Sequence, residues 1–253
     1  QTFSFQVWPM PSRLSGKSAA VSEVRAALSP QPISTPTAAG IPARFVGGDF
    51  FDFFFRGDQL TIIVADVSGK GVPAAMFMAV TRTILRHLVT TGLSPAEALT
   101  RANAMLIDDS TESMFVTVFI AQYDPGRGLV LFAHAGHPPP FVIRGQQVLP
   151  AGQPTGTVLG VVEDSLYTQD HFTLAPGDRL VVYTDGLTEA HDPNRVMLGT
   201  DRAASLTVEV SQAAPADFCA GVMARVEAFQ AGKLHDDITL LSLTRRGEGS
   251  AAP

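Results

Sequence analysis

The sequence predicts an α+β protein in which antiparallel sheets are covered by helices. Two strand-like segments, 114–123 and 129–135, flank a turn that contains Pro125 and two glycines, as in a β-hairpin. Segments with helical periodicity come in two pairs: 72–91 with 94–108, and 201–211 with 215–229. Hairpin-linked strands and paired helices favour antiparallel sheets over a parallel sheet with alternating helices.

Length and composition exclude several classes of protein. The 253 residues can bury a substantial core, and 45% are hydrophobic while 17% are charged. Because a usual charged share is about 25%, disorder over most of the length is excluded. The net charge of −6 and the absence of a long basic run argue against a nucleic-acid or anionic-membrane partner.

Cysteine content and the length of apolar runs bear on location. Cys219 is the single cysteine, which excludes an internal disulfide or a cysteine-based zinc site and favours a reducing compartment, the cytoplasm. Its apolar helical surroundings predict a core residue. The longest apolar stretches, such as 114–121, have about half the length of a bilayer crossing, so we expect no membrane span. The chain begins with Gln1 and has no signal-peptide pattern, so we expect a fragment or a processed chain.

The first 40 residues differ from the rest because Ser, Pro, Ala and Thr dominate them. Val21, Val24 and Leu28 share one face of a predicted helix over 18–28. That face is narrow, and a helix of about eleven residues is unstable alone, so it predicts packing on the rest of the folded chain, on a second copy or on an upstream domain.

The sequence divides into three parts. Four prolines in 29–42 predict a linker or an extended arm. We therefore expect a linker with one helix over 1–40, a folded domain over 41–245 and a loose tail over 246–253.

The elements of the folded domain follow in order. A buried strand over 59–66 ends at a glycine-containing turn, and Pro73 lies near the start of the following helix, where proline is tolerated. Ser94 and Glu97 form a capping box at the start of the next helix. Further strands are predicted at 140–144, 166–174, 179–183 and 238–243.

Four aspartates share a position at the ends of predicted strands: Asp49, Asp66, Asp185 and Asp236. An acid at a strand end is often a simple turn former, but four with the same placement predict a common site. Converging carboxylates repel one another and persist when a cation neutralises them. Ligation by oxygen alone suits Mg²⁺ or Mn²⁺.

Five motifs occur in a fixed order: RFVGGDFFD at 44–52, ADVSGKG at 65–71, AGHPP at 135–139, YTDGLTEA at 183–190 and DDIT at 236–239. Together they resemble the bacterial branch of the PP2C-like, metal-dependent serine/threonine phosphatases, the SpoIIE and RsbU type. The resemblance covers residues 18–245. It implies a four-layer α-β-β-α sandwich with two mainly antiparallel sheets face to face.

The resemblance also implies two Mg²⁺ or Mn²⁺ ions at one edge of the sandwich. Asp66 would bridge both ions, and the Val67 carbonyl would bind one of them. Asp185 and Asp236 would hold the other, while Asp49 would contribute directly or through water. Asp66, Asp185 and Asp236 are thus the implied catalytic residues. Metal-bound water would attack the phosphoryl group, so no protein nucleophile is needed.

Residues around this ligand set have implied supporting roles. Asp237 would orient its neighbours, and Gly48 and Gly186 would allow close approach to the site. Arg44 has the spacing of a phosphate-binding arginine, and its alternative is a surface ion pair. His137 is either the general acid or a residue that fixes its loop. Animal members carry a histidine just after the bridging aspartate, which is absent here, so the general acid remains unassigned.

Three other readings compete with a phosphatase. Gly47-Gly48-Asp49-Phe50-Phe51 is similar to the diguanylate-cyclase signature, but Phe50 replaces the second acid. Lys70 is not part of a P-loop, because the first glycine of that motif is missing and Gly71 follows the lysine. A pseudophosphatase that acts only as a binding module remains the alternative.

The resemblance implies partners as well as chemistry. The implied substrate is phosphoserine or phosphothreonine on a STAS-type anti-sigma-factor antagonist in a partner-switching pathway. An upstream sensor or receiver domain and a homodimer are also expected.

Overall fold

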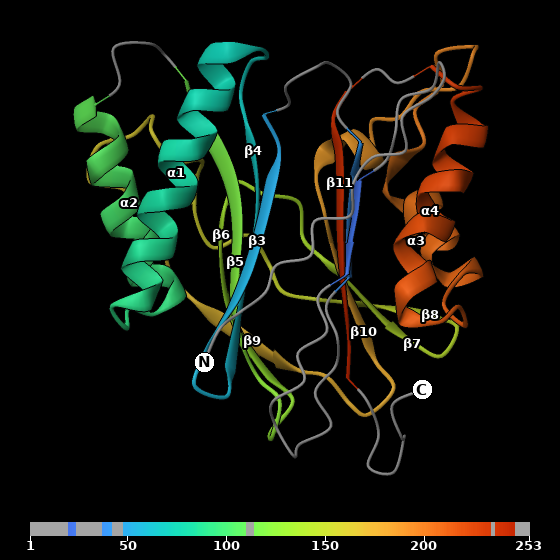
Figure 1. Cartoon of the computed structure of the whole chain (residues 1–253), viewed down its shortest axis with the longest axis horizontal. Coiled ribbons are helices and arrows are strands. Elements are labelled where there is room, and N and C mark those ends of the chain that lie inside the picture. The colour runs from blue at the N-terminus through green and yellow to red at the C-terminus, as the bar shows by residue number, and fades with distance from the viewer. Residues whose placement is uncertain (1–19, 24–36, 42–47, 110–113, 234–235, 246–253) are drawn as a thin grey trace.

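Two sheets lie face to face in the computed structural model, and each carries a pair of helices on its outer side (Figure 1). The structure describes residues 20–23, 37–41, 48–109, 114–233 and 236–245. This arrangement is the α-β-β-α sandwich that the resemblance implied, and it confirms the predicted antiparallel sheets.

The first sheet has five strands in the order β3-β4-β5-β6-β9, and all neighbours are antiparallel. Its strands are β3 (Phe50–Arg56), β4 (Gln59–Val67), β5 (Val116–Asp124), β6 (Leu129–Ala135) and β9 (Asp170–Thr173). The predicted hairpin is the β5–β6 pair, whereas β9 is shorter than the strand expected at 166–174.

The second sheet has six strands in the order β1-β2-β11-β10-β7-β8, also antiparallel throughout. Its strands are β1 (Ala20–Glu23), β2 (Thr37–Ile41), β7 (Phe141–Arg144), β8 (Gln147–Pro150), β10 (Arg179–Tyr183) and β11 (Ile238–Thr244). The sequence did not indicate β1, β2 or β8.

Four α-helices cover the two sheets (Figure 1). The first sheet carries α1 (Val72–Thr90) and α2 (Pro95–Asp109), and the second carries α3 (Gly199–Glu209) and α4 (Pro215–Phe229). The predicted capping box is confirmed at α2, where Ser94 and Glu97 exchange hydrogen bonds. Among the described helices, none combines the length and apolarity that a membrane crossing requires.

The apolar run of β4 is continuous because both faces of its sheet are covered. Ile62 packs between the two sheets, and its neighbour Ile63 packs against the helices on the other face. Successive side chains of a strand point to opposite faces, so both faces of β4 must be apolar. A third apolar layer joins the second sheet to α3 and α4 and contains Cys219, as predicted.

The predicted helix over 18–28 is wrong where the structure describes it. Residues 20–23 form β1, which pairs with β2, and β2 pairs with β11. A short helix with a narrow apolar face gains little stability, whereas a strand at this edge gains hydrogen bonds from its neighbour. The expected boundary between residues 40 and 41 falls inside β2. Residues 24–36 and 246–253 lie outside the described residues.

Candidate metal centre

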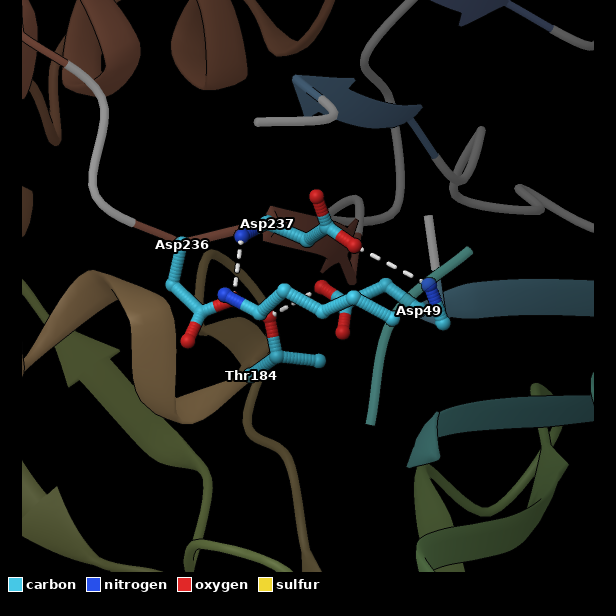
Figure 2. Close-up of polar contacts among 6 residues, drawn as sticks. Asp49, Thr184, Asp236 and Asp237 are labelled. Atoms are coloured by element: carbon cyan, nitrogen blue, oxygen red, sulfur yellow. Dashed lines mark hydrogen bonds and ion pairs between the residues drawn. The ribbon is translucent and has the colours of Figure 1, made fainter. Parts of the chain in front are cut away.

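Strand register brings the four aspartates to one edge of the sandwich. Asp49 precedes β3 and Asp66 lies near the end of β4; the pairing of Phe50 with Ala65 places them side by side in the first sheet. Asp185 follows β10 and begins a short 3-10 helix, and Asp236 precedes β11 in the second sheet. Figure 2 shows Asp49 beside Asp236, Asp237 and Thr184, so the group draws on both sheets.

The site is electrostatically strained by its own carboxylates. Burial, followed by the neighbouring negative charges, raises the pKa of Asp66 to about 9. Those charges belong to Asp49, Asp185 and Asp236, which places these three acids within electrostatic reach of Asp66. Burial also raises the pKa of Asp49 to about 6 and raises the pKa of Asp185. A divalent cation would reverse this penalty, because it favours the charged form of every carboxylate around it.

A lysine currently supplies positive charge to this group. Lys70, in the loop between β4 and α1, places its Nζ 2.5 Å from Asp236 Oδ1. Within the described residues, no three His, Cys, Asp or Glu side chains are gathered closely enough to hold an ion as they stand. The donor set is nevertheless all oxygen, which fits Mg²⁺ or Mn²⁺. Loading the site therefore requires side-chain movements, including movement of Lys70 away from Asp236.

A close backbone contact lies next to Asp49. A Cβ atom on Gly48 would lie 2.7 Å from the carbonyl oxygen of Val67, closer than real Cβ atoms approach. Only glycine therefore lets the chain before β3 lie against the end of β4. A Cβ on Gly186 would likewise collide with the carbonyl of Asp237. The two glycines therefore let neighbouring backbone segments lie close together at the site.

Two side chains connect the sheets beside the acids (Figure 2). The Gly48 N–H donates to Asp237 Oδ2 at 3.0 Å. The Thr184 hydroxyl donates to Asp49 Oδ2 at 2.6 Å and accepts from the Thr239 N–H at 2.9 Å. The Asp237 carboxylate thus holds the backbone N–H of Gly48, next to Asp49. Sequence reasoning assigned no role to Thr184, whose one signal was a hydroxyl residue between a predicted strand and Asp185.

His137 lies in the interior and not at the mouth of the site. Its side chain is buried, and its Nδ1 is 2.9 Å from the Thr117 hydroxyl. Thr117 is paired with Asp66 across β4 and β5. Burial, with a smaller effect from His134, lowers the pKa of His137 to about 3. A neutral, buried imidazole favours the loop-fixing alternative over the general acid. The remaining predicted residue, Arg44, lies outside the described residues.

A family model and a known relative both match most of this chain. The family model for "Stage II sporulation protein E (SpoIIE)" matches residues 56–246. Phosphoserine phosphatase RsbU of Bacillus subtilis is 30% identical over 210 residues, which are 83% of this chain and 62% of RsbU. The chain therefore spans less than two thirds of that relative.

Solved structures agree with the sequence match. The RsbU and RsbW domains of Rv1364c from Mycobacterium tuberculosis align with a TM-score of 0.73 at 28% identity, over 88% of this chain and 62% of that one. The SiaA-PP2C domain of Pseudomonas aeruginosa aligns with a TM-score of 0.75 at 23% identity, over 83% and 85% of the two chains. Because the family match runs from the first sheet through the last strand of the second, the chain belongs to the SpoIIE family.

Proposed function

We propose that the chain is a metal-dependent phosphoprotein phosphatase that hydrolyses phosphoserine or phosphothreonine. The observation that carries this proposal is the meeting of Asp49, Asp66, Asp185 and Asp236 from both sheets at one edge. Buried acids that raise one another's pKa are poor isolated anions but good ligands for a divalent cation. The name of the relative RsbU, a phosphoserine phosphatase, supports the reaction class.

Each acid has a proposed role toward two Mn²⁺ or Mg²⁺ ions. Asp66 would be a ligand shared between the ions, the Val67 carbonyl would bind one of them, Asp185 and Asp236 would hold the other, and Asp49 would bind directly or through water. Bound ions would supply an activated water and neutralise phosphoryl charge, which removes the need for a protein nucleophile. Arg44 is proposed to bind the phosphoryl group, because a guanidinium fork matches its oxygens.

We further propose the biological setting that the family resemblance implies. The substrate is a phosphorylated STAS-type protein of a partner-switching pathway, in the cytoplasm. A sensor or receiver domain precedes the phosphatase in the whole protein, and the chain forms a homodimer. The catalytic domain extends over 41–245, and β1 and β2 add strands at the edge of its second sheet.

Phosphate release tests the reaction directly. The chain is freed of metal with EDTA, then assayed on an aryl phosphate, a phosphoserine peptide and phosphorylated STAS proteins, with Mn²⁺, Mg²⁺ or Ca²⁺ added back. We expect release with Mn²⁺ or Mg²⁺ but not with Ca²⁺, whose longer bonds and looser geometry suit this chemistry poorly. Release that persists in EDTA contradicts metal dependence. Tight binding of metal and phosphoprotein without release would instead establish the pseudophosphatase alternative.

A further inference from the structure

The two sheets are linked at the metal centre by a chain of hydrogen bonds through one side chain. Thr184 is the residue between β10 and Asp185, and it is fully buried. Its hydroxyl accepts a hydrogen bond from the Thr239 N–H of β11 at 2.9 Å. The same hydroxyl lies 2.6 Å from Asp49 Oδ2, on the first sheet. The Thr184 N–H in turn donates to the Thr239 carbonyl at 3.1 Å, so the two residues are also joined through their backbones.

The direction of these bonds is fixed by elementary hydrogen-bond chemistry. An amide N–H can only donate, so the Thr184 oxygen is the acceptor in its bond with Thr239. The hydroxyl proton is then free for Asp49, which receives it at Oδ2. A bond from a hydroxyl to a carboxylate is stronger than a bond between neutral groups, and the 2.6 Å distance is in the range of such bonds.

Asp49 lies between Thr184 and the other acids of the site. The pairing of Phe50 with Ala65 places Asp49 beside Asp66, on the neighbouring strand β4. The hydrogen-bonded path therefore runs from the β11 backbone through Thr184 to Asp49, which lies beside Asp66. It joins the second sheet to the first at the point where the ligands of a metal must converge.

We infer that Thr184 is a positioning residue for the metal centre, whose hydroxyl fixes the Asp49 carboxylate against Asp66. This inference rests on the proposed function. Asp49 lies just before β3, where no ladder partner holds it, so its side chain needs an external anchor. Groups that orient metal ligands by hydrogen bonding typically change metal affinity about 10- to 100-fold when they are removed.

Three variants separate the hydroxyl from the rest of the side chain. Thr184→Val keeps the shape and removes the hydroxyl, whereas Thr184→Ser keeps the hydroxyl and removes a methyl group. Thr61→Val is the matched control: Thr61 is a buried threonine of β4 whose hydroxyl has no hydrogen-bond partner among the described residues. All three are compared with the wild-type chain.

The first readout is Mn²⁺ affinity without substrate, measured by isothermal titration calorimetry on the metal-free protein. We expect Thr184→Val to bind Mn²⁺ about 10- to 100-fold more weakly. Thr184→Ser and Thr61→Val should stay within about threefold of the wild type. Wild-type affinity in Thr184→Val overturns the inference. Equal losses in Thr184→Ser and Thr184→Val also overturn it, because the methyl group and not the hydroxyl would then matter.

The second readout needs no metal, so it separates this inference from the proposed function. Hydrogen exchange of the Thr239 amide is measured in the metal-free protein. We expect faster exchange in Thr184→Val, because that amide loses its side-chain acceptor, and unchanged exchange in Thr61→Val. If the wild type binds no Mn²⁺, the proposed function fails, and faster exchange would then leave Thr184 as a structural link only, which refutes its role toward a metal. Unchanged exchange in Thr184→Val refutes the link itself.

Discussion

The positive charge of Lys70 opposes metal binding at the site in which it lies. Its ammonium group lies on Asp236, and its positive charge also lowers the pKa of Asp185 against the stronger effect of burial. In the metal-free chain this charge partly neutralises the acids. A divalent cation must displace it, so Lys70 and the metal compete for the same carboxylate.

Removing that charge should strengthen metal binding. We expect Lys70→Met to bind Mn²⁺ several-fold more tightly than the wild type, because Asp236 no longer has a resident cation. Calorimetric titration of the metal-free proteins measures the difference. Arg127→Met is a suitable control, because it removes an exposed positive charge from the β5–β6 turn, at the opposite end of the sheet. Weaker binding in Lys70→Met would show that the lysine supports the metal instead.

Single residues were predictable where their chemistry was explicit in the sequence. Asp49, Asp66, Asp185 and Asp236 were identified because four carboxylates at the ends of predicted strands form a recognisable set. Thr184 was not identified, because a threonine at a strand end has many ordinary uses. Its role depends on Asp49, which is far away in the sequence and close only after the two sheets meet.

The predicted bounds of individual helices and strands were most accurate where several local signals agreed. The limits of β10 and α4 match the predicted ranges, since apolar runs, Pro215 and flanking turns all mark them. β1 was misread as a helix because three apolar residues at helical spacing were the only local signal. Its partner β2 and the edge of the second sheet decide its conformation, and neither could be inferred from local spacing.

Strand β6 carries a polar residue whose burial makes stability depend on pH. His134 is fully buried between the rings of Phe119 and Phe132, at centroid distances of 4.9 and 5.2 Å. Burial lowers its pKa to about 4, whereas an unfolded histidine has a pKa near 6.5. Below about pH 6.5 the unfolded chain therefore binds a proton that the folded chain excludes. The free energy of unfolding therefore decreases as the pH is lowered from about 6.5 towards the folded pKa of about 4.

A substitution in β6 isolates this effect. We expect the wild type to lose about 1 kcal/mol more stability than His134→Leu between pH 7 and pH 5.5, from the linkage of one such group. Urea unfolding at both pH values gives the two differences. The carboxylates titrate in both proteins, so the comparison removes their contribution. Identical pH dependence in the two proteins would mean that His134 is not kept neutral by the fold.

At the scale of the whole molecule, the site exists because two sheets share an edge. Asp66 lies in β4 beside the start of β3, which Asp49 precedes, and Asp185 and Asp236 lie just beyond the paired ends of β10 and β11. The fold class and the strand-end acids were predictable from residue patterns and from the family resemblance. The meeting of the sheets through Gly48, Thr184 and Asp237 was not, because it depends on contacts between distant segments.

Phosphate release by Asp66→Asn tests the central claim most directly. The change removes one charge from a group of like charges, so the metal-free variant should fold and resist urea at least as well as the wild type. We predict that wild-type chain with Mn²⁺ releases phosphate from a phosphoserine peptide, and that Asp66→Asn under the same conditions releases none above background. If folded Asp66→Asn releases phosphate at the wild-type rate, the reaction does not take place at this carboxylate group.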